Sequence, residues 1–171
     1  LDAATLALDT GPGCGVIDRV VTALDPSNDY DADGLMAAAG TPVESVLQTL
    51  LSDDWYGLIP PKSTGREKYD AAFVADLIAC CRATGDVTDE DVIATATALT
   101  ARTIGLGYDR FVRPDVQDAV LSGGGARNPT LVSMIRRALP LRTVRTFEEL
   151  FFDGEAKEAV AFAFIALQHL R

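Results

Sequence analysis

The sequence is short of positive charge. It contains 15 lysines and arginines against 25 aspartates and glutamates, which leaves a net charge of −10 at pH 7. Nucleic acids and anionic membranes repel such a chain, so we expect neither as a partner. The sequence also lacks an apolar run near the roughly 20 residues that a membrane span needs. Its three cysteines have no metal-binding spacing, which favours a reduced, cytoplasmic setting over a disulfide framework.

What the sequence does contain is an alternation of β-type and helical segments. With 171 residues, 48% of them hydrophobic, the chain can bury a core, and we expect one domain of the α/β class. Because it has no initiator methionine and begins just before a predicted strand, we expect it to be part of a longer protein. The predicted strands are residues 3–8, 116–121 and 141–145, and the predicted helices are 16–24, 42–51, 70–83, 88–104, 128–139 and 154–170.

Three of the predicted helices begin with capping signals. Thr41 and Asn128 are each followed by a proline, which suits the first helical position. Thr88 is followed three residues later by an aspartate, the spacing of a capping box, and acids fill the first turn. We therefore predict Thr41, Thr88 and Asn128 as N-caps.

The stretch LDTGPGCG, residues 8–15, places an acid, a hydroxyl and three glycines between the first predicted strand and the first helix. In open α/β sheets the chemistry gathers at the carboxyl ends of strands, where Asp9 would lie. There Asp9 could hold Mg²⁺ or act as a general base, and the helix N-terminus could receive an anion. A tight turn with Asp9 as an ordinary cap explains the local pattern equally well.

A second glycine loop, SGGGARNP, occupies residues 122–129 and again joins a predicted strand to a capped helix. Three consecutive glycines cost backbone entropy, so some close approach of another group is expected there. That group could be a nucleotide base or sugar, and helix–strand packing is the alternative. Two such loops in one domain are a stronger signal than one.

The segment PPKSTGRE, residues 60–67, lies in the one long stretch with neither helical nor strand period. Its prolines stiffen the chain ahead of a lysine, two hydroxyls and an arginine. It resembles a Walker A tail only superficially, since the leading glycines are absent. Contact with a substrate or phosphate and an ordinary solvated surface both remain open.

The segment DGEAKEA opens the last predicted helix with Glu155 and Glu158 on one face. Early acids complement the helix dipole, and this is sufficient to account for Glu155. Glu158 stands where the helix becomes apolar, so it could point into a cleft.

Five segments, in this order, resemble the C-terminal half of the anhydro-N-acetylmuramic acid kinase family. The resemblance covers essentially the whole chain, and its most specific parts are PPKSTGRE and KEAVAFA. The fungal levoglucosan kinases share the pattern. The matching segments are LDTGPG (8–13) with the following Ile17 and Asp18, YDADG (30–34), PPKSTGRE (60–67), SGGGARNP (122–129) and GEAKEAVAFA (154–163).

The resemblance implies an actin-like, sugar-kinase and Hsp70-type fold, related to ribonuclease H, in which two lobes enclose an ATP cleft. Residues 1–171 would be the C-terminal nucleotide-binding lobe, with a short mixed sheet and several helices, and the N-terminal lobe would be absent from this chain. The implied reaction opens the 1,6-anhydro bridge of 1,6-anhydro-N-acetylmuramic acid with water while ATP phosphorylates O6, as in cell-wall sugar recycling. ATP or ADP, Mg²⁺, the anhydrosugar and the missing lobe would be the partners, and the family also suggests a homodimer.

The resemblance also implies roles for individual residues. Asp9 would be the general base and, together with Glu158, a metal ligand. The sugar side of the cleft would be lined by Lys62, Ser63, Thr64 and Arg66. The nucleotide would lie against Thr10, Gly11, Gly13, Gly123, Gly124, Gly125 and Asn128.

The sequence departs from the family pattern in three places. Cys14 stands where the family usually has asparagine, which removes an amide beside the phosphates, and Glu155 stands in place of aspartate. The family's other phosphate loop, a Met-Ser-Gly-Thr-Ser-like segment, has no counterpart here, so we expect the isolated chain to be inactive. The alternatives are a truncated or degenerate nucleotide-binding module without catalysis and a kinase that acts on levoglucosan.

Overall fold

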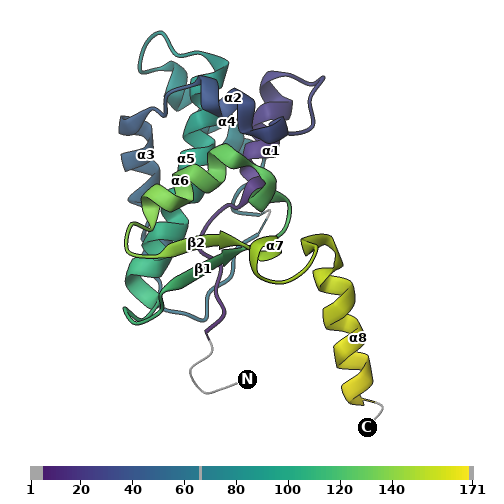
Figure 1. Cartoon of the computed structure of the whole chain (residues 1–171). Coiled ribbons are helices and arrows are strands. Elements are labelled where there is room, and N and C mark those ends of the chain that lie inside the picture. The colour runs from purple at the N-terminus through teal and green to yellow at the C-terminus, as the bar shows by residue number, and fades with distance from the viewer. Residues whose placement is uncertain (1–5, 66, 170–171) are drawn as a thin grey trace.

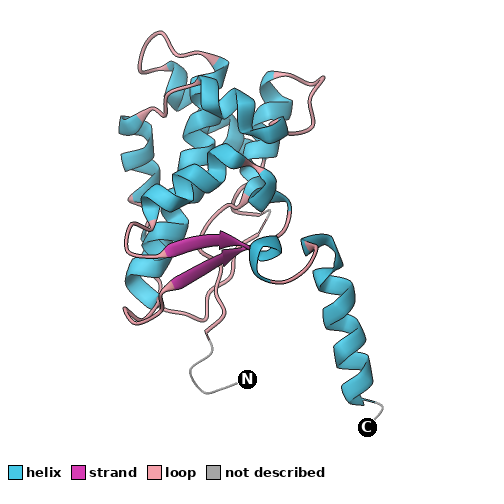
Figure 2. Cartoon of the chain, viewed as in Figure 1, coloured by secondary structure: helices cyan, strands magenta, loops and turns pink. Residues whose placement is uncertain are grey.

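The computed structural model describes residues 6–65 and 67–169, which fold into eight α-helices and two β-strands (Figure 1). Helices make up most of the molecule, and the two strands lie at one end of the helical body (Figure 2). The elements are α1 (Cys14–Leu24), α2 (Leu35–Ala39), α3 (Glu44–Leu51), α4 (Ala71–Arg82), α5 (Asp89–Phe111), β1 (Asp118–Leu121), α6 (Pro129–Ala138), β2 (Thr143–Thr146), α7 (Phe147–Leu150) and α8 (Lys157–His169).

Helix α5 is the centre of the core. Every residue from 92 to 101 is buried, because α1, α2, α3, α4 and α6 all pack against this helix. The buried stretch reads VIATATALTA, and its small alanines and threonines allow neighbours to approach from all sides. A helix that is apolar around its whole circumference is suited to such a position. The predicted capping box is confirmed: Thr88 Oγ1 accepts from Asp91 N, and the Asp91 carboxylate accepts from Thr88 N.

The sheet consists of β1 and β2, paired in parallel from Asp118↔Thr143 to Leu121↔Thr146. Both strands were predicted close to these bounds. Helix α6 crosses between them and returns the chain in the same direction, so this sheet is parallel where a mixed one was expected. Ala119 and Val144 are buried, whereas Val120 is 41% exposed.

The predicted strand 3–8 is not formed where it can be checked. Residues 3–5 lie outside the described residues, and residues 6–8 belong to no strand. Among the described residues β1 and β2 pair only with each other, whereas this segment runs beside the PPKSTGRE loop. A backbone hydrogen bond from Asp9 N to Lys62 O, 3.1 Å long, joins the two.

The predicted helix starts are correct in two of three cases. Asn128 caps α6 with Pro129 at the first helical position, and Thr88 caps α5. The prediction of Thr41 is wrong, because α3 begins at Glu44 with Val43 as N-cap. Thr41 N instead donates to the Asp91 carboxylate at 2.6 Å, which ties this segment to the start of α5.

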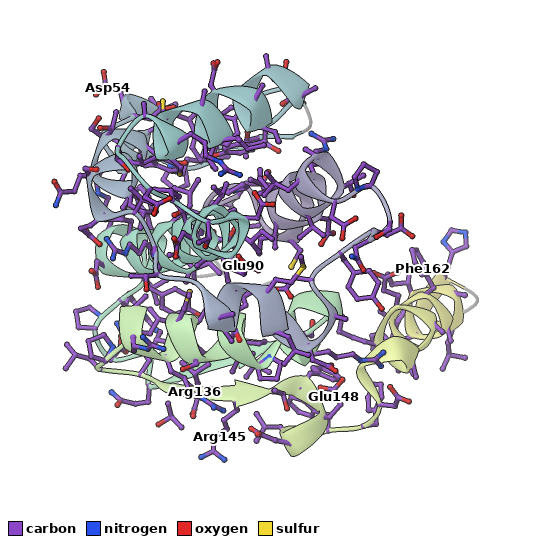
Figure 3. The ribbon with its side chains drawn as sticks, turned by 90° about the horizontal axis from the view of Figure 1, so that it is seen from above. Asp54, Glu90, Arg136, Arg145, Glu148 and Phe162 are labelled. Atoms are coloured by element: carbon purple, nitrogen blue, oxygen red, sulfur yellow. The ribbon has the colours of Figure 1, made fainter. Side chains whose placement is uncertain are left out.

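Helix α8 projects from the rest of the molecule (Figure 1). The broad apolar face predicted for it is present, but none of the side chains described on α8 is buried; Phe162, for example, is 70% exposed at the edge of the molecule (Figure 3). Within residues 6–65 and 67–169, no helix combines the length and the apolar character that crossing a membrane requires.

The packing of α3 against α5 yields a stability prediction. Thr95 Oγ1 accepts a 2.9 Å hydrogen bond from Val43 N, whereas the equally buried Thr97 bonds only to a carbonyl of its own helix. Thr95→Val should lower the free energy of unfolding by about 1–3 kcal/mol, since it leaves an amide without a partner. Thr97→Val is the matched control and should cost less than about 1 kcal/mol. Urea denaturation measures both; equal losses would contradict this role for Thr95.

Candidate active site

The LDTGPG and PPKSTGRE segments meet at Asp9. The Oδ2 atom of Asp9 accepts hydrogen bonds from Ser63 Oγ at 2.7 Å and from Thr64 N at 2.9 Å. The Ser63 hydroxyl, followed by the Thr64 amide, lowers the pKa of the Asp9 carboxyl below its usual value. Asp9 is therefore ionised at neutral pH, as a metal ligand or a proton acceptor must be.

The N-terminus of α1 follows directly from this carboxylate. Its N-cap, Gly13, has a left-handed φ of 62° and supplies no side-chain cap. The loop is seated on α5: Thr100 Oγ1 donates to Gly13 O at 2.8 Å, and a Cβ on Gly11 would lie 2.3 Å from Thr103 Oγ1. The first amides of α1 are thus free of a side-chain partner, and such amides attract anions.

The two glycine loops touch each other. A Cβ added to Gly125 would lie 2.7 Å from Cys14 Sγ, so the contact requires glycine at position 125. Gly123 has a φ of 85° and turns the chain into the short 3-10 turn at residues 124–127. The side chain of Asn128 is engaged as the cap of α6, where its Oδ1 accepts from Leu131 N at 2.8 Å.

Of the cavities that border α1, two reach the loops of the candidate site, and another lies between α1 and α4. The larger of the two, of about 830 Å³, lies toward the second glycine loop, and the smaller, of about 420 Å³, lies toward the PPKSTGRE loop. Asp18 lines both. The larger cavity is also bordered by Cys14, Tyr30, Gly124, Gly125 and Asn128, and the smaller by Gly11, Gly15, Arg19, Thr64 and Gly65.

Of the four residues predicted to contact the sugar, two lie at the candidate site. Ser63 holds Asp9, and Thr64 lines the smaller cavity. Lys62 is directed elsewhere: its Nζ donates to the carbonyls of Tyr56 at 3.0 Å and Trp55 at 3.3 Å. Arg66 lies outside the described residues.

The other predicted residues lie around the same loops. Thr10 packs its methyl group against Gly107 of α5. Glu158 is exposed in the first turn of α8 and lines neither cavity. Its neighbour Lys157 donates to Ser122 Oγ, which places the start of α8 beside the second glycine loop.

Asp18 and Arg19 are cavity residues that sequence reasoning left without a role. Two signals for Asp18 were available in the sequence: it belongs to the matching family segment, and it stands four residues after Cys14, so the two share a face of α1. Burial raises the pKa of the Asp18 carboxyl. Arg19 donates through Nη1 to the backbone carbonyl of Tyr69.

Comparison with known proteins gives one consistent answer. The family model described as anhydro-N-acetylmuramic acid kinase matches residues 2–171. Three curated relatives bear that name. The protein from Streptomyces avermitilis is 44% identical over 92% of this chain and 40% of its own length, and the protein from Caldanaerobacter subterraneus subsp. tengcongensis is 41% identical over 94% of this chain and 41% of its own length. The protein from Bacillus cereus is 37% identical over 95% of this chain and 43% of its own length. The chain spans about two fifths of the length of these relatives.

The hydrogen bonds at Asp9 yield a titration prediction. Ser63→Ala removes the larger cause of the lowered pKa, so the pKa of Asp9 should rise toward its ordinary value. Carboxyl carbon NMR during an acid titration measures it. Asp25, whose pKa is lowered by Ser27 and Asn28, is an internal control and should not change. An unaltered Asp9 titration in the variant would show that the Ser63 bond does not hold in solution.

Proposed function

Because the chain belongs to the anhydro-N-acetylmuramic acid kinase family, we propose that it forms the C-terminal, nucleotide-binding lobe of such a kinase, with an actin-like fold. The remaining three fifths of the relatives' length would correspond to the other lobe. The contact of Asp9 with Ser63 and Thr64, at the foot of an uncapped helix, is the observation that carries the proposal. It joins LDTGPG to PPKSTGRE, one of the two most specific segments of the family pattern, in one site.

The proposed ligand arrangement follows from the two cavities. The phosphates of ATP would lie at the α1 N-terminus, where backbone amides and the helix dipole favour negative charge. The adenosine would enter the 830 Å³ cavity and lie against Gly124 and Gly125. The anhydrosugar would lie toward Asp9 and Thr64, closed in by the other lobe; Lys62 and Arg66 remain predictions for this side.

The proposed reaction uses Asp9 as the general base. Water attacks C1 of the sugar, the C1–O6 bond of the anhydro bridge breaks, and O6 takes the γ-phosphoryl group of ATP. The proton of the attacking water passes to the ionised carboxylate of Asp9. Ser63 and Thr64 orient this carboxylate through Oδ2, which leaves Oδ1 for the water.

Mg²⁺, when bound, would neutralise the phosphate charge during transfer. No group of three or more His, Cys, Asp or Glu side chains within the described residues could hold an ion alone. Mg²⁺ commonly takes one or two carboxylates and completes its shell with phosphate and water, so Asp9 fits this role. Glu158 as a second ligand stays a prediction.

The presence of Cys14 favours a second candidate function, that of a nucleotide-binding module that does not catalyse a reaction. Its thiol occupies the contact with Gly125 where the family's usual asparagine would bring an amide to the phosphates. Cys14→Asn in the full-length protein separates the two candidates: a large gain in kinase activity would indicate that the present chain is degenerate.

Nucleotide binding is the first test of the proposal. Calorimetric titration should show Mg²⁺-dependent ADP binding, weakened about tenfold in Asp9→Asn if this carboxylate supports the metal. Asp25→Asn is the matched control, since Asp25 lies at the other end of α1 and is similarly hydrogen-bonded. Kinase turnover by the isolated chain should be absent in a coupled ADP-release assay. Mg²⁺–ADP binding that is equal in both variants would refute the placement of Asp9 at the phosphates.

The second glycine loop allows a test of close approach. A Cβ on Gly124 would meet nothing within 4 Å, whereas one on Gly125 would strike Cys14. Gly124→Ala should therefore leave the melting temperature unchanged and raise the Kd for ADP about fivefold, or about 1 kcal/mol. Gly125→Ala should lower both stability and affinity. An unchanged Kd for ADP in Gly124→Ala would show that the nucleotide does not lie against the backbone of Gly124.

A further inference from the structure

Asp18 lies where the two cavities of the candidate site meet, and its carboxylate has no partner among the described residues. It lies on α1, one turn beyond the uncapped N-terminus, and lines both the 830 Å³ and the 420 Å³ cavity. In the part of the chain that the structure describes, no hydrogen bond or ion pair reaches its side chain. The neighbouring Arg19 is turned to the Tyr69 carbonyl. A half-buried carboxylate in this situation is available to a cation or a donor group that enters either cavity.

A second polar group in the smaller cavity is also unsatisfied. The hydroxyl oxygen of Thr64 is buried and, among the described residues, has no hydrogen-bond partner. Buried hydroxyls are nearly always bonded, so this one is available to a ligand group or a water in the cavity. The backbone amide of Thr64 donates to the Asp9 carboxylate, so the Thr64 hydroxyl belongs to a residue in direct contact with the proposed base.

Asp18 and a phosphate at the α1 N-terminus would repel each other unless a cation lies between them. We propose that Asp18 is a metal-directed residue, which holds, directly or through water, the Mg²⁺ ion that accompanies the nucleotide phosphates. The Thr64 hydroxyl bonds to a water of that ion or to a phosphate oxygen. This inference rests on the proposed nucleotide-binding function and gives a role to Asp18, which the family pattern includes without a role.

The role of Asp18 is tested by the metal dependence of ADP binding. The Kd for ADP is measured with excess EDTA and with Mg²⁺, and Mn²⁺ bound in the presence of ADP is counted by electron paramagnetic resonance. The factor by which Mg²⁺ raises the affinity for ADP should be about tenfold smaller in Asp18→Asn than in the wild type. It should also bind metal-free ADP at least as tightly as the wild type, because the repulsion is gone. A merely structural residue would not produce this reversal.

Asp29→Asn is the matched control, since Asp29 borders the same large cavity but is exposed. It should keep the full Mg²⁺ enhancement. If Asp18→Asn keeps it too, or if both variants lose it equally, the assignment of Asp18 is overturned while the nucleotide lobe stands. If the wild type binds no ADP under either condition, the proposed function itself fails.

Broadening of wild-type amide signals by Mn²⁺–ADP gives a measurement that needs no variant. The signals of residues 17–19 should broaden more than those of residues 29–30. The opposite order would place the ion away from Asp18 and overturn the inference even if Asp18→Asn failed to fold.

Discussion

The close packing around α5 is the constraint on which the rest of the structure depends. Five helices can surround it only because its sequence is built from small residues, and several contacts leave no room for a side chain. A Cβ on Gly40 would lie 2.1 Å from Glu90 O, and one on Gly105 would lie 2.9 Å from Ala138 O. Interiors packed this tightly transmit displacement instead of absorbing it. Helix α5 therefore acts as the fixed support for the loops that surround it.

The candidate site is built directly on this support. Thr100 and Thr103 of α5 hold the backbone of the first glycine loop, and Gly107 receives Thr10. The loop in turn positions Asp9 against Ser63 and presents the open end of α1. The proposed chemistry uses backbone amides and one carboxylate, which contacts within the protein position. Such preorganisation is what a phosphoryl-transfer site requires, since its catalysis is largely positioning and electrostatics.

Local signals predicted most of the helices and two of the three strands. The caps at Thr88 and Asn128 were recognisable because a cap is made within four residues. Thr41 was misassigned because a tertiary hydrogen bond to Asp91 outweighed its local preference. The strand 3–8 could not be judged from its own residues, since a strand exists only with a neighbour. The same limit holds for the site: the sequence indicated each loop, but Cys14 against Gly125 and Asp9 against Ser63 are contacts between segments far apart in the chain.

The contact between Cys14 and Gly125 has a consequence for how this protein can diverge. Each position lies in a different loop, yet the room available at one is set by the side chain at the other. A larger residue at position 14 would leave less room beside Gly125 of the second glycine loop. Any side chain at position 125 would displace the residue at position 14 in the first glycine loop. Substitutions at the two positions should therefore appear together across descendants of this sequence. Such coupled substitution would keep the distance between the two glycine loops constant while the residues at positions 14 and 125 change.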